Sequence, residues 1–289
     1  MLRQEIEVEH DGTTLAGSLW LPTDPVTAVL MHPGSGANDR HNNGYFNAIR
    51  DHLLNERIAV ASFDKRGVGE STGHWLEAGI ETQAADLALC AGEVRRHAAL
   101  AGVPFGIFGH SQGGWVVVEA AGSGLEVDFV VVNSGPGVTV MMQDRYALRR
   151  ELEATGATPY EIEDRLSLFD QVVELASLDV GYAEVATNAA LAPYLSSDAA
   201  HWRFWKEILP YDPVPAMGRI TAPTLALFGE QDVLVPVPES VALFSVHVDP
   251  GLLQVEVFPD ADHRMQIDKD GNLAPGYLDR VSAFASAVN

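Results

Sequence analysis

The sequence predicts an α/β protein, a mostly parallel eight-stranded sheet flanked by helices and carrying an inserted all-helical cap. From about residue 26 onward, short β-branched or apolar runs alternate with longer helical patterns, which is typical of a parallel sheet with helices on both faces. The alternation breaks once, between about residues 137 and 217, where only helical spacing appears. A length of 289 residues suits one large domain with such an insertion.

Two of the expected strands precede the alternating region. Residues 6–9 and 14–21 alternate in period two on either side of Asp11-Gly12, a pattern that predicts an antiparallel hairpin at the sheet edge. The other strands are expected over 28–31, 58–63, 105–108, 129–132, 224–228 and 253–258. The helices between and after them are expected over 45–55, 80–97, 112–121, 238–244 and 277–287.

The insertion has its own helical pattern. Apolar residues spaced i, i+3, i+4 predict helices over 141–154, 159–176 and 181–191. We therefore expect a core formed by residues 1–136 and 218–289 and a helical cap over 137–217. The many aromatic side chains of this cap either pack against one another or line a substrate cavity.

Composition excludes several classes of protein. The chain has 40 acidic residues against 18 Lys and Arg, a formal charge of −22 and a pI near 4.6, which disfavours binding to nucleic acid or to an anionic membrane surface. No apolar run approaches the roughly 18 residues that a membrane span needs, and residues 1–11 show no secretory signal. The one cysteine, Cys90, has the apolar helical context of a packing residue. We expect a cytoplasmic protein.

The pattern Gly-x-Ser-x-Gly occurs twice, around Ser71 and around Ser111. Only Ser111 lies between an expected strand, 105–108, and an apolar helix, which is the context of a nucleophile elbow. Ser71 lies in a polar, glycine-rich loop well beyond the end of its strand. We predict that Ser111 is the nucleophile and that the loop around Ser71 is structural, held by Asp64 and Arg66.

A serine nucleophile needs a histidine base and a carboxylate that orients the base. Asp232 follows the expected strand 224–228, and His263 follows 253–258. Both lie where parallel strands end, at the edge where open α/β sheets gather their sites. The order Ser, acid, His along the chain is that of a nucleophile-elbow enzyme. Glu230, Asp260 and Asp262 are alternatives for the acid.

The developing oxyanion needs two N–H donors. The backbone N–H of Gln112, directly after the nucleophile, is expected to be one of them. The second is expected from the glycine-rich turn at residues 32–36. Pro33 has no N–H, so we favour Ser35, with Gly34 as the alternative.

Together these motifs resemble the α/β-hydrolase fold family over the whole chain. The motifs that carry the resemblance are residues 32–36, 63–71, 109–114, 229–232 and 262–263, in family order. The chain is most similar to serine esterases with a helical cap, and also to the hydrolase domain of acyl-peptide hydrolases. The resemblance implies a Ser-His-Asp triad with no metal and no cofactor. Pro33, where many relatives carry glycine, departs from the family pattern.

We therefore predict a serine hydrolase that cleaves a carboxylic ester of a small-molecule acyl substrate. The same site would also suit acyl transfer, lactone or peptide cleavage, or a cyclisation or elimination step in biosynthesis. A non-catalytic small-molecule receptor is the alternative from another class, although a receptor needs no complete triad. The sequence is compatible with a homodimer.

Overall fold

The computed structural model describes residues 2–195 and 198–287, in which eight strands form one sheet in the order β1-β2-β4-β3-β5-β6-β7-β8. β1 is antiparallel to β2 and β2 is antiparallel to β4, whereas every other neighbouring pair is parallel. The strands are β1 (Leu2–His10), β2 (Thr13–Leu21), β3 (Thr27–His32), β4 (Ile58–Phe63), β5 (Phe105–His110), β6 (Phe129–Asn133), β7 (Thr224–Gly229) and β8 (Leu253–Phe258). The predicted fold class is confirmed.

The hairpin that opens the chain turns where the sequence indicates. Asp11 and Gly12 both have positive φ, 47° and 77°, which is the backbone that a two-residue hairpin turn requires. The turn pairs His10 with Thr13 and extends the register to Leu2 and Leu21. β1 is therefore longer than the predicted 6–9.

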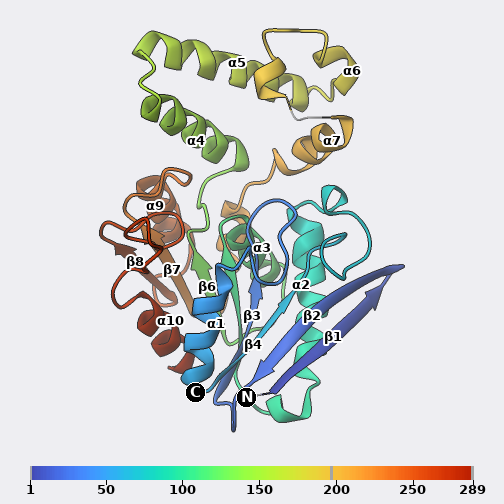
Figure 1. Ribbon diagram of the computed structural model, residues 1–289, viewed down its shortest axis with the longest axis vertical. Helices are drawn as coiled ribbons and strands as arrows, with labels where there is room; N and C mark the ends of the chain where they lie inside the picture. The colour runs from blue at the N-terminus through green and yellow to red at the C-terminus, as the bar shows by residue number, and fades with distance from the viewer. Residues whose placement is uncertain (1, 196–197, 288–289) are drawn as a thin grey trace.

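Helices cover both faces of the sheet (Figure 1). Alternate strand residues contact opposite layers, so that Leu30 and Ile107 pack with α2 (Ile80–Arg95) and α3 (Gln112–Gly122). Met31 and Phe108 pack with the other layer, α1 (Phe46–Asn55) and α10 (Tyr277–Ser286). α9 (Val237–His247) adds its buried Phe244 to the layer of α2 and α3. Cys90 is buried in that layer.

The segment between β6 and β7 contains helices α4 (Val140–Ala154), α5 (Pro159–Ser177), α6 (Tyr182–Val185), α7 (Ala199–Ile208) and α8 (Val214–Met217), and the 3₁₀ turn η3 (Ala192–Tyr194). Thr158 begins α5 with a capping box to Glu161, and Asp198 caps α7 through the N–H groups of Ala200 and His201. We call α4, α5, α6, η3 and α7 the helical insertion. Since β6 ends at Asn133 and the chain then enters α4, the insertion stands over the carboxyl edge of the sheet (Figure 1).

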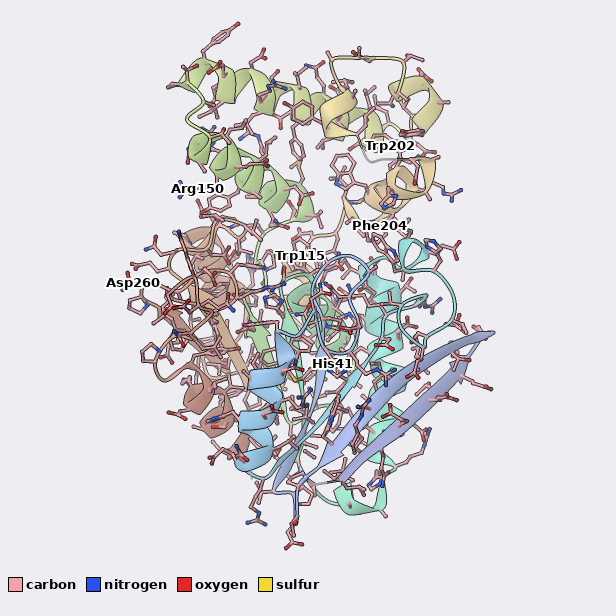
Figure 2. All side chains as sticks on the ribbon, in the orientation of Figure 1. His41, Trp115, Arg150, Trp202, Phe204 and Asp260 are labelled. Carbon is pink, nitrogen blue, oxygen red and sulfur yellow. The ribbon has the colours of Figure 1, made fainter. Side chains whose placement is uncertain are left out.

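The insertion has a small apolar core of its own and a second contact with the sheet layers. Trp202 belongs to the insertion's cluster with Phe169 and Leu209. Phe204, two residues later on α7, belongs to the main core and contacts Trp75 with ring centroids 5.3 Å apart. Figure 2 shows Trp202 inside the insertion and Phe204 on the side toward the sheet. These two contacts dock α7 onto the rest of the chain.

One local prediction within this segment is wrong, and two of its helices were not predicted. The expected helix over 181–191 is only the four-residue α6, because the side chain of Asn188 accepts the N–H of Ala190 and so competes with helical bonding. The four-residue α8 and the helix α7 were not predicted, although Trp202, Trp205 and Ile208 recur at helical spacing along α7. Outside this segment the observed helix ends differ from the predicted ends by a few residues. For example, α2 ends at Arg95 because the side chain of His97 caps the 3₁₀ turn that follows.

Candidate active site

Ser111 lies at a sharp turn between β5 and α3. Its φ and ψ are 56° and −123°, a conformation that costs free energy for any residue with a Cβ and that marks functional turns. The turn is possible because glycines flank it: a Cβ on Gly109 would lie 1.9 Å from the carbonyl oxygen of Gly113, and one on Gly113 would lie 2.5 Å from that of His32. Ser111 therefore lies partly exposed at the carboxyl edge of the sheet, at the start of α3.

Asp232 and His263 form a pair at the same edge. Nδ1 of His263 lies 2.7 Å from Oδ2 of Asp232. The other carboxylate oxygen, Oδ1, accepts the backbone N–H groups of Leu234 and Val235 at 2.8 and 2.9 Å. Asp232 is 3% exposed, so its carboxylate is held from both sides and presents one oxygen to the imidazole.

The three alternative acids are placed differently. Glu230 and Asp260 are exposed. Asp262 uses Oδ1 to accept the N–H groups of Arg264 and Gln266, which shapes the loop that carries His263. The structure thus gives Asp232, and none of the other three, a hydrogen bond to the His263 ring.

His110 connects the loop of His263 to the nucleophile turn. Its Nε2 donates to the backbone oxygen of His263 at 3.3 Å, and its Nδ1 lies 3.0 Å from Nδ2 of Asn42. The rings of His110 and His263 are 5.1 Å apart between centroids. Burial lowers the pKa of His110 well below its usual value, so it is a neutral spacer beside Ser111. Among the described residues, Oγ of Ser111 makes no hydrogen bond to the His263 ring.

The glycine-rich turn at residues 32–36, where the sequence predicts the second oxyanion donor and which we call the oxyanion turn, lies directly against Ser111. A Cβ on Gly34 would lie 3.4 Å from Cβ of Ser111. The N–H of Gly34 donates to Oδ1 of Asn42 at 3.3 Å, whereas within residues 2–195 and 198–287 the N–H groups of Ser35 and Gln112 have no acceptor. Of the two candidates in the turn, Ser35 is therefore the one whose N–H is free.

A buried lysine, which the sequence did not single out, lies behind this turn. Nζ of Lys65 donates to the carbonyl oxygen of Gly34 and, at 2.9 Å, to Oε1 of Gln112. Burial lowers the pKa of Lys65 to about 7, and burial lowers the pKa of neighbouring His32 to about 3. The sequence signal for Lys65 was a cation two residues after the end of a buried strand, which by itself does not show where the side chain points.

The second Gly-x-Ser-x-Gly motif belongs to the fold. Ser71 is buried, and its Oγ donates to the backbone oxygen of Asp64 and accepts the N–H of Ala16, both at 2.9 Å. The partner of Asp64 is Arg40, which binds both carboxylate oxygens. Of the two residues expected to hold this loop, Asp64 accepts the N–H of Glu70 at 3.0 Å, whereas Arg66 pairs with Asp86 on α2. Arg40 lies far from Asp64 in sequence, so no local pattern indicated the pair.

Two cavities lie beneath the helical insertion and share Tyr194 and Trp205 as a common wall. One, of about 600 Å³, reaches Val233 and Leu234 beside Asp232. The other, of about 390 Å³, reaches Gly36 of the oxyanion turn. Each cavity is thus lined both by residues of the insertion and by a loop that follows a strand of the sheet.

Helix α4 of the insertion contacts the acid loop. Oη of Tyr146 donates to the backbone oxygen of Asp232 at 3.1 Å, and the Gln143 amide donates to that of Leu234 at 3.0 Å. The carboxyl of Asp144 faces the larger cavity, accepts Nε1–H of Trp205 at 3.3 Å, and has its pKa raised to about 6 by burial. A movement of α4 would therefore displace the loop that carries Asp232.

The described residues contain no group of three His, Cys, Asp or Glu side chains arranged to hold a metal ion. None of the helices over residues 2–195 and 198–287 has the length and apolar character needed to cross a membrane. The pair of His263 and Asp232 at this edge of the sheet is suited to proton transfer, and the N–H groups of Ser35 and Gln112 are suited to binding an anion.

Comparison with known proteins supports the fold of the chain. A model of a hydrolase family described as serine aminopeptidase, S33, matches residues 25–270. No curated protein sequence matches the chain. Among solved structures, an esterase of Pyrococcus furiosus has a TM-score of 0.69 and 17% identity over 99% of this chain and 91% of that one. A 2,6-dihydroxy-pseudo-oxynicotine hydrolase has a TM-score of 0.64 and 19% identity over 99% and 67%. The esterase Est1E of Butyrivibrio proteoclasticus, with ferulic acid bound, has a TM-score of 0.62 and 16% identity over 98% and 96%.

Proposed function

This chain belongs to the serine aminopeptidase S33 family of hydrolases, and from that premise we propose that it cleaves carboxylic esters through an acyl-enzyme on Ser111. The observation that carries the proposal is the 2.7 Å hydrogen bond between His263 and the buried Asp232 at the sheet edge where Ser111 is partly exposed. A receptor would need no such buried, fully bonded acid behind an imidazole.

The first half of the reaction acylates the serine. Nε2 of His263 takes the proton of Ser111 as its oxygen attacks the ester carbonyl, and Asp232 holds the other ring nitrogen as its N–H donor. The N–H groups of Gln112 and Ser35 bind the oxygen of the tetrahedral intermediate. His263 then returns its proton to the departing alcohol. The hydrogen bond from Ser111 to His263 closes in the substrate complex, since catalytic hydrogen bonds are often long in the empty enzyme.

The second half releases the acid. A water molecule gives its proton to Nε2 of His263 and attacks the acyl carbon, and the same two donors bind the second oxyanion. The proton then passes from His263 to Ser111. We propose that residues 137–217 form the cap and select the substrate, because Tyr194 and Trp205 line both cavities beside the site.

The test is labelling with a fluorophosphonate followed by peptide mapping. We expect one adduct, on Ser111, absent in Ser111→Ala and strongly slowed in His263→Ala, together with turnover of p-nitrophenyl esters. A matched panel of short and long acyl esters and aminoacyl p-nitroanilides separates ester from peptide cleavage. An unlabelled Ser111 in folded protein refutes the serine-hydrolase proposal, and turnover of anilides alone refutes the ester assignment.

A further inference from the structure

Lys65 is buried behind the two proposed oxyanion donors. It follows β4, is 7% exposed, and lines a cavity of about 30 Å³ together with Gln112. Among residues 2–195 and 198–287, its ammonium donates to two acceptors, the carbonyl oxygen of Gly34 and Oε1 of Gln112. One acceptor belongs to the turn that carries the Ser35 N–H, and the other to the residue whose own N–H is the second donor.

The bond to Gly34 acts on the N–H of Ser35 through a single peptide unit. The carbonyl of Gly34 and the N–H of Ser35 belong to the same planar, trans amide, so they point in opposite directions. Holding the carbonyl toward Lys65 therefore directs the N–H away from it. A cation on the carbonyl oxygen also polarises the amide, which makes its N–H a stronger donor.

Two carboxylates close to Lys65 are paired with arginines instead. Asp64, its sequence neighbour, is bound by Arg40, and Asp86 of the same cavity is bound by Arg66. No ion pair to Lys65 exists within residues 2–195 and 198–287. Burial without a counter-charge also explains why the pKa of Lys65 falls to about 7. The donors of Lys65 thus face neutral oxygens of the oxyanion turn and of Gln112.

The two chain segments that Lys65 joins are already in close contact. A Cβ on Gly113 would lie 2.5 Å from the backbone oxygen of His32, and one on Gly34 would lie 3.3 Å from Nδ1 of His110. Such backbone contacts bring the segments together, but they do not set the rotation of the Gly34–Ser35 peptide. A side-chain donor at its carbonyl does.

We propose that Lys65 is a positioning residue of the oxyanion hole: by bonding the carbonyl of Gly34 and the side chain of Gln112, it orients both N–H donors and strengthens that of Ser35. The proposal rests on the proposed function, because an oxyanion hole has meaning only if Ser111 forms tetrahedral intermediates. It assigns Lys65 to transition-state stabilisation rather than to substrate binding.

The test is Lys65→Met, which keeps the length of the side chain and removes its donors and charge. We expect kcat on a p-nitrophenyl ester to fall about 10- to 100-fold, below the loss typical for deleting a whole donor, with KM within about 3-fold. A trifluoromethyl ketone, which forms an oxyanion on the serine, should lose affinity by the same factor as kcat. Lys269→Met, at an exposed lysine, is the matched control and should leave both quantities unchanged.

The possible outcomes distinguish a failure of this inference from a failure of the proposed function. If Ser111 is labelled but folded Lys65→Met keeps kcat within about 3-fold of wild type, or loses kcat without losing affinity for the ketone, the positioning role is refuted. If Ser111 is not labelled in the wild type, the proposed function fails first. Should Lys65→Met not fold, Gln112→Met replaces it, because it removes one of the two Lys65 bonds. A loss of about 3- to 10-fold in kcat and in ketone affinity supports the proposal, and wild-type values overturn it.

Discussion

Replacing Asp232 by Asn tests the acid-base pair most directly, because the surroundings of the carboxylate decide which way the new amide must face. The carbonyl of that amide can serve either His263 or the N–H groups of Leu234 and Val235 that now bond Oδ1. Turning the amide NH₂ toward those two N–H groups would leave the part-buried N–H of Leu234 and the buried N–H of Val235 without an acceptor, at about 1–3 kcal/mol for the buried donor. The amide therefore keeps its oxygen on the loop and presents NH₂ to the imidazole.

An NH₂ group facing Nδ1 forces that nitrogen to accept a hydrogen bond, so the ring proton moves to Nε2. A protonated Nε2 cannot take the proton of Ser111. For this change of tautomer we expect kcat to fall about 10⁴-fold, or about 5.4 kcal/mol of transition-state stabilisation. The fold should survive, because Asp232→Asn preserves shape and both loop hydrogen bonds.

The assay is p-nitrophenyl ester turnover normalised to folded protein by circular dichroism. Glu230→Gln is the matched control, since it neutralises an exposed carboxylate in the same loop, and it should change kcat less than about 2-fold. A loss below about 10-fold in folded Asp232→Asn would show that Asp232 does not set the tautomer of His263. A comparable loss in Glu230→Gln would point to a general effect of charge on the loop.

Three further variants test the surroundings of the site. Ser71→Ala should retain labelling of Ser111 and lower the free energy of unfolding in urea by about 1–3 kcal/mol, because the buried N–H of Ala16 loses its acceptor; unchanged stability would contradict the structural role. Asp144→Asn should raise the free energy of unfolding at pH 8 by about 1–3 kcal/mol but change it little at pH 4. The pKa of Asp144 is raised from 3.8 to about 6, so the stability that the protonated Asp144 carboxyl contributes is fully present below pH 3.8 and is lost as the pH rises through about 6. An equal effect of the substitution at both pH values would exclude this cause. Gly109→Ala should abolish soluble expression, because its Cβ would overlap a backbone oxygen at 1.9 Å; normal yield would show that the turn relaxes.

The core strands were predictable because burial on both faces produces a simple sequence pattern. A central parallel strand is buried on both faces, so runs such as 129–132 and 224–228 are apolar almost throughout. The turn at Ser111 was predictable for a related reason, since its backbone tolerates only glycine at the closest contacts, and the glycines at 109 and 113 are visible in the sequence. The local sequence is therefore enough to predict both the core strands and the turn at Ser111.

Buried charges were not predictable in the same way. Arg40 is 4% exposed and binds Asp64, Glu5 and Glu70, which come from distant parts of the chain. An arginine or lysine reads in sequence as a surface residue, and only the folded arrangement shows whether carboxylates or carbonyls surround it. The same reason hid Lys65, whose acceptors lie in two other segments.

Burial also explains how His263 can be the base when other histidines lie close by. His32 and His110 lie within the same edge of the sheet, and burial holds both in the neutral form through the physiological range. Neither has a carboxylate partner among the described residues, so neither can stabilise an imidazolium. His263 has such a partner, in the 2.7 Å hydrogen bond to Asp232. In the proposed mechanism the base is thus distinguished from its neighbours because one imidazole has a carboxylate partner and the other two are buried without one.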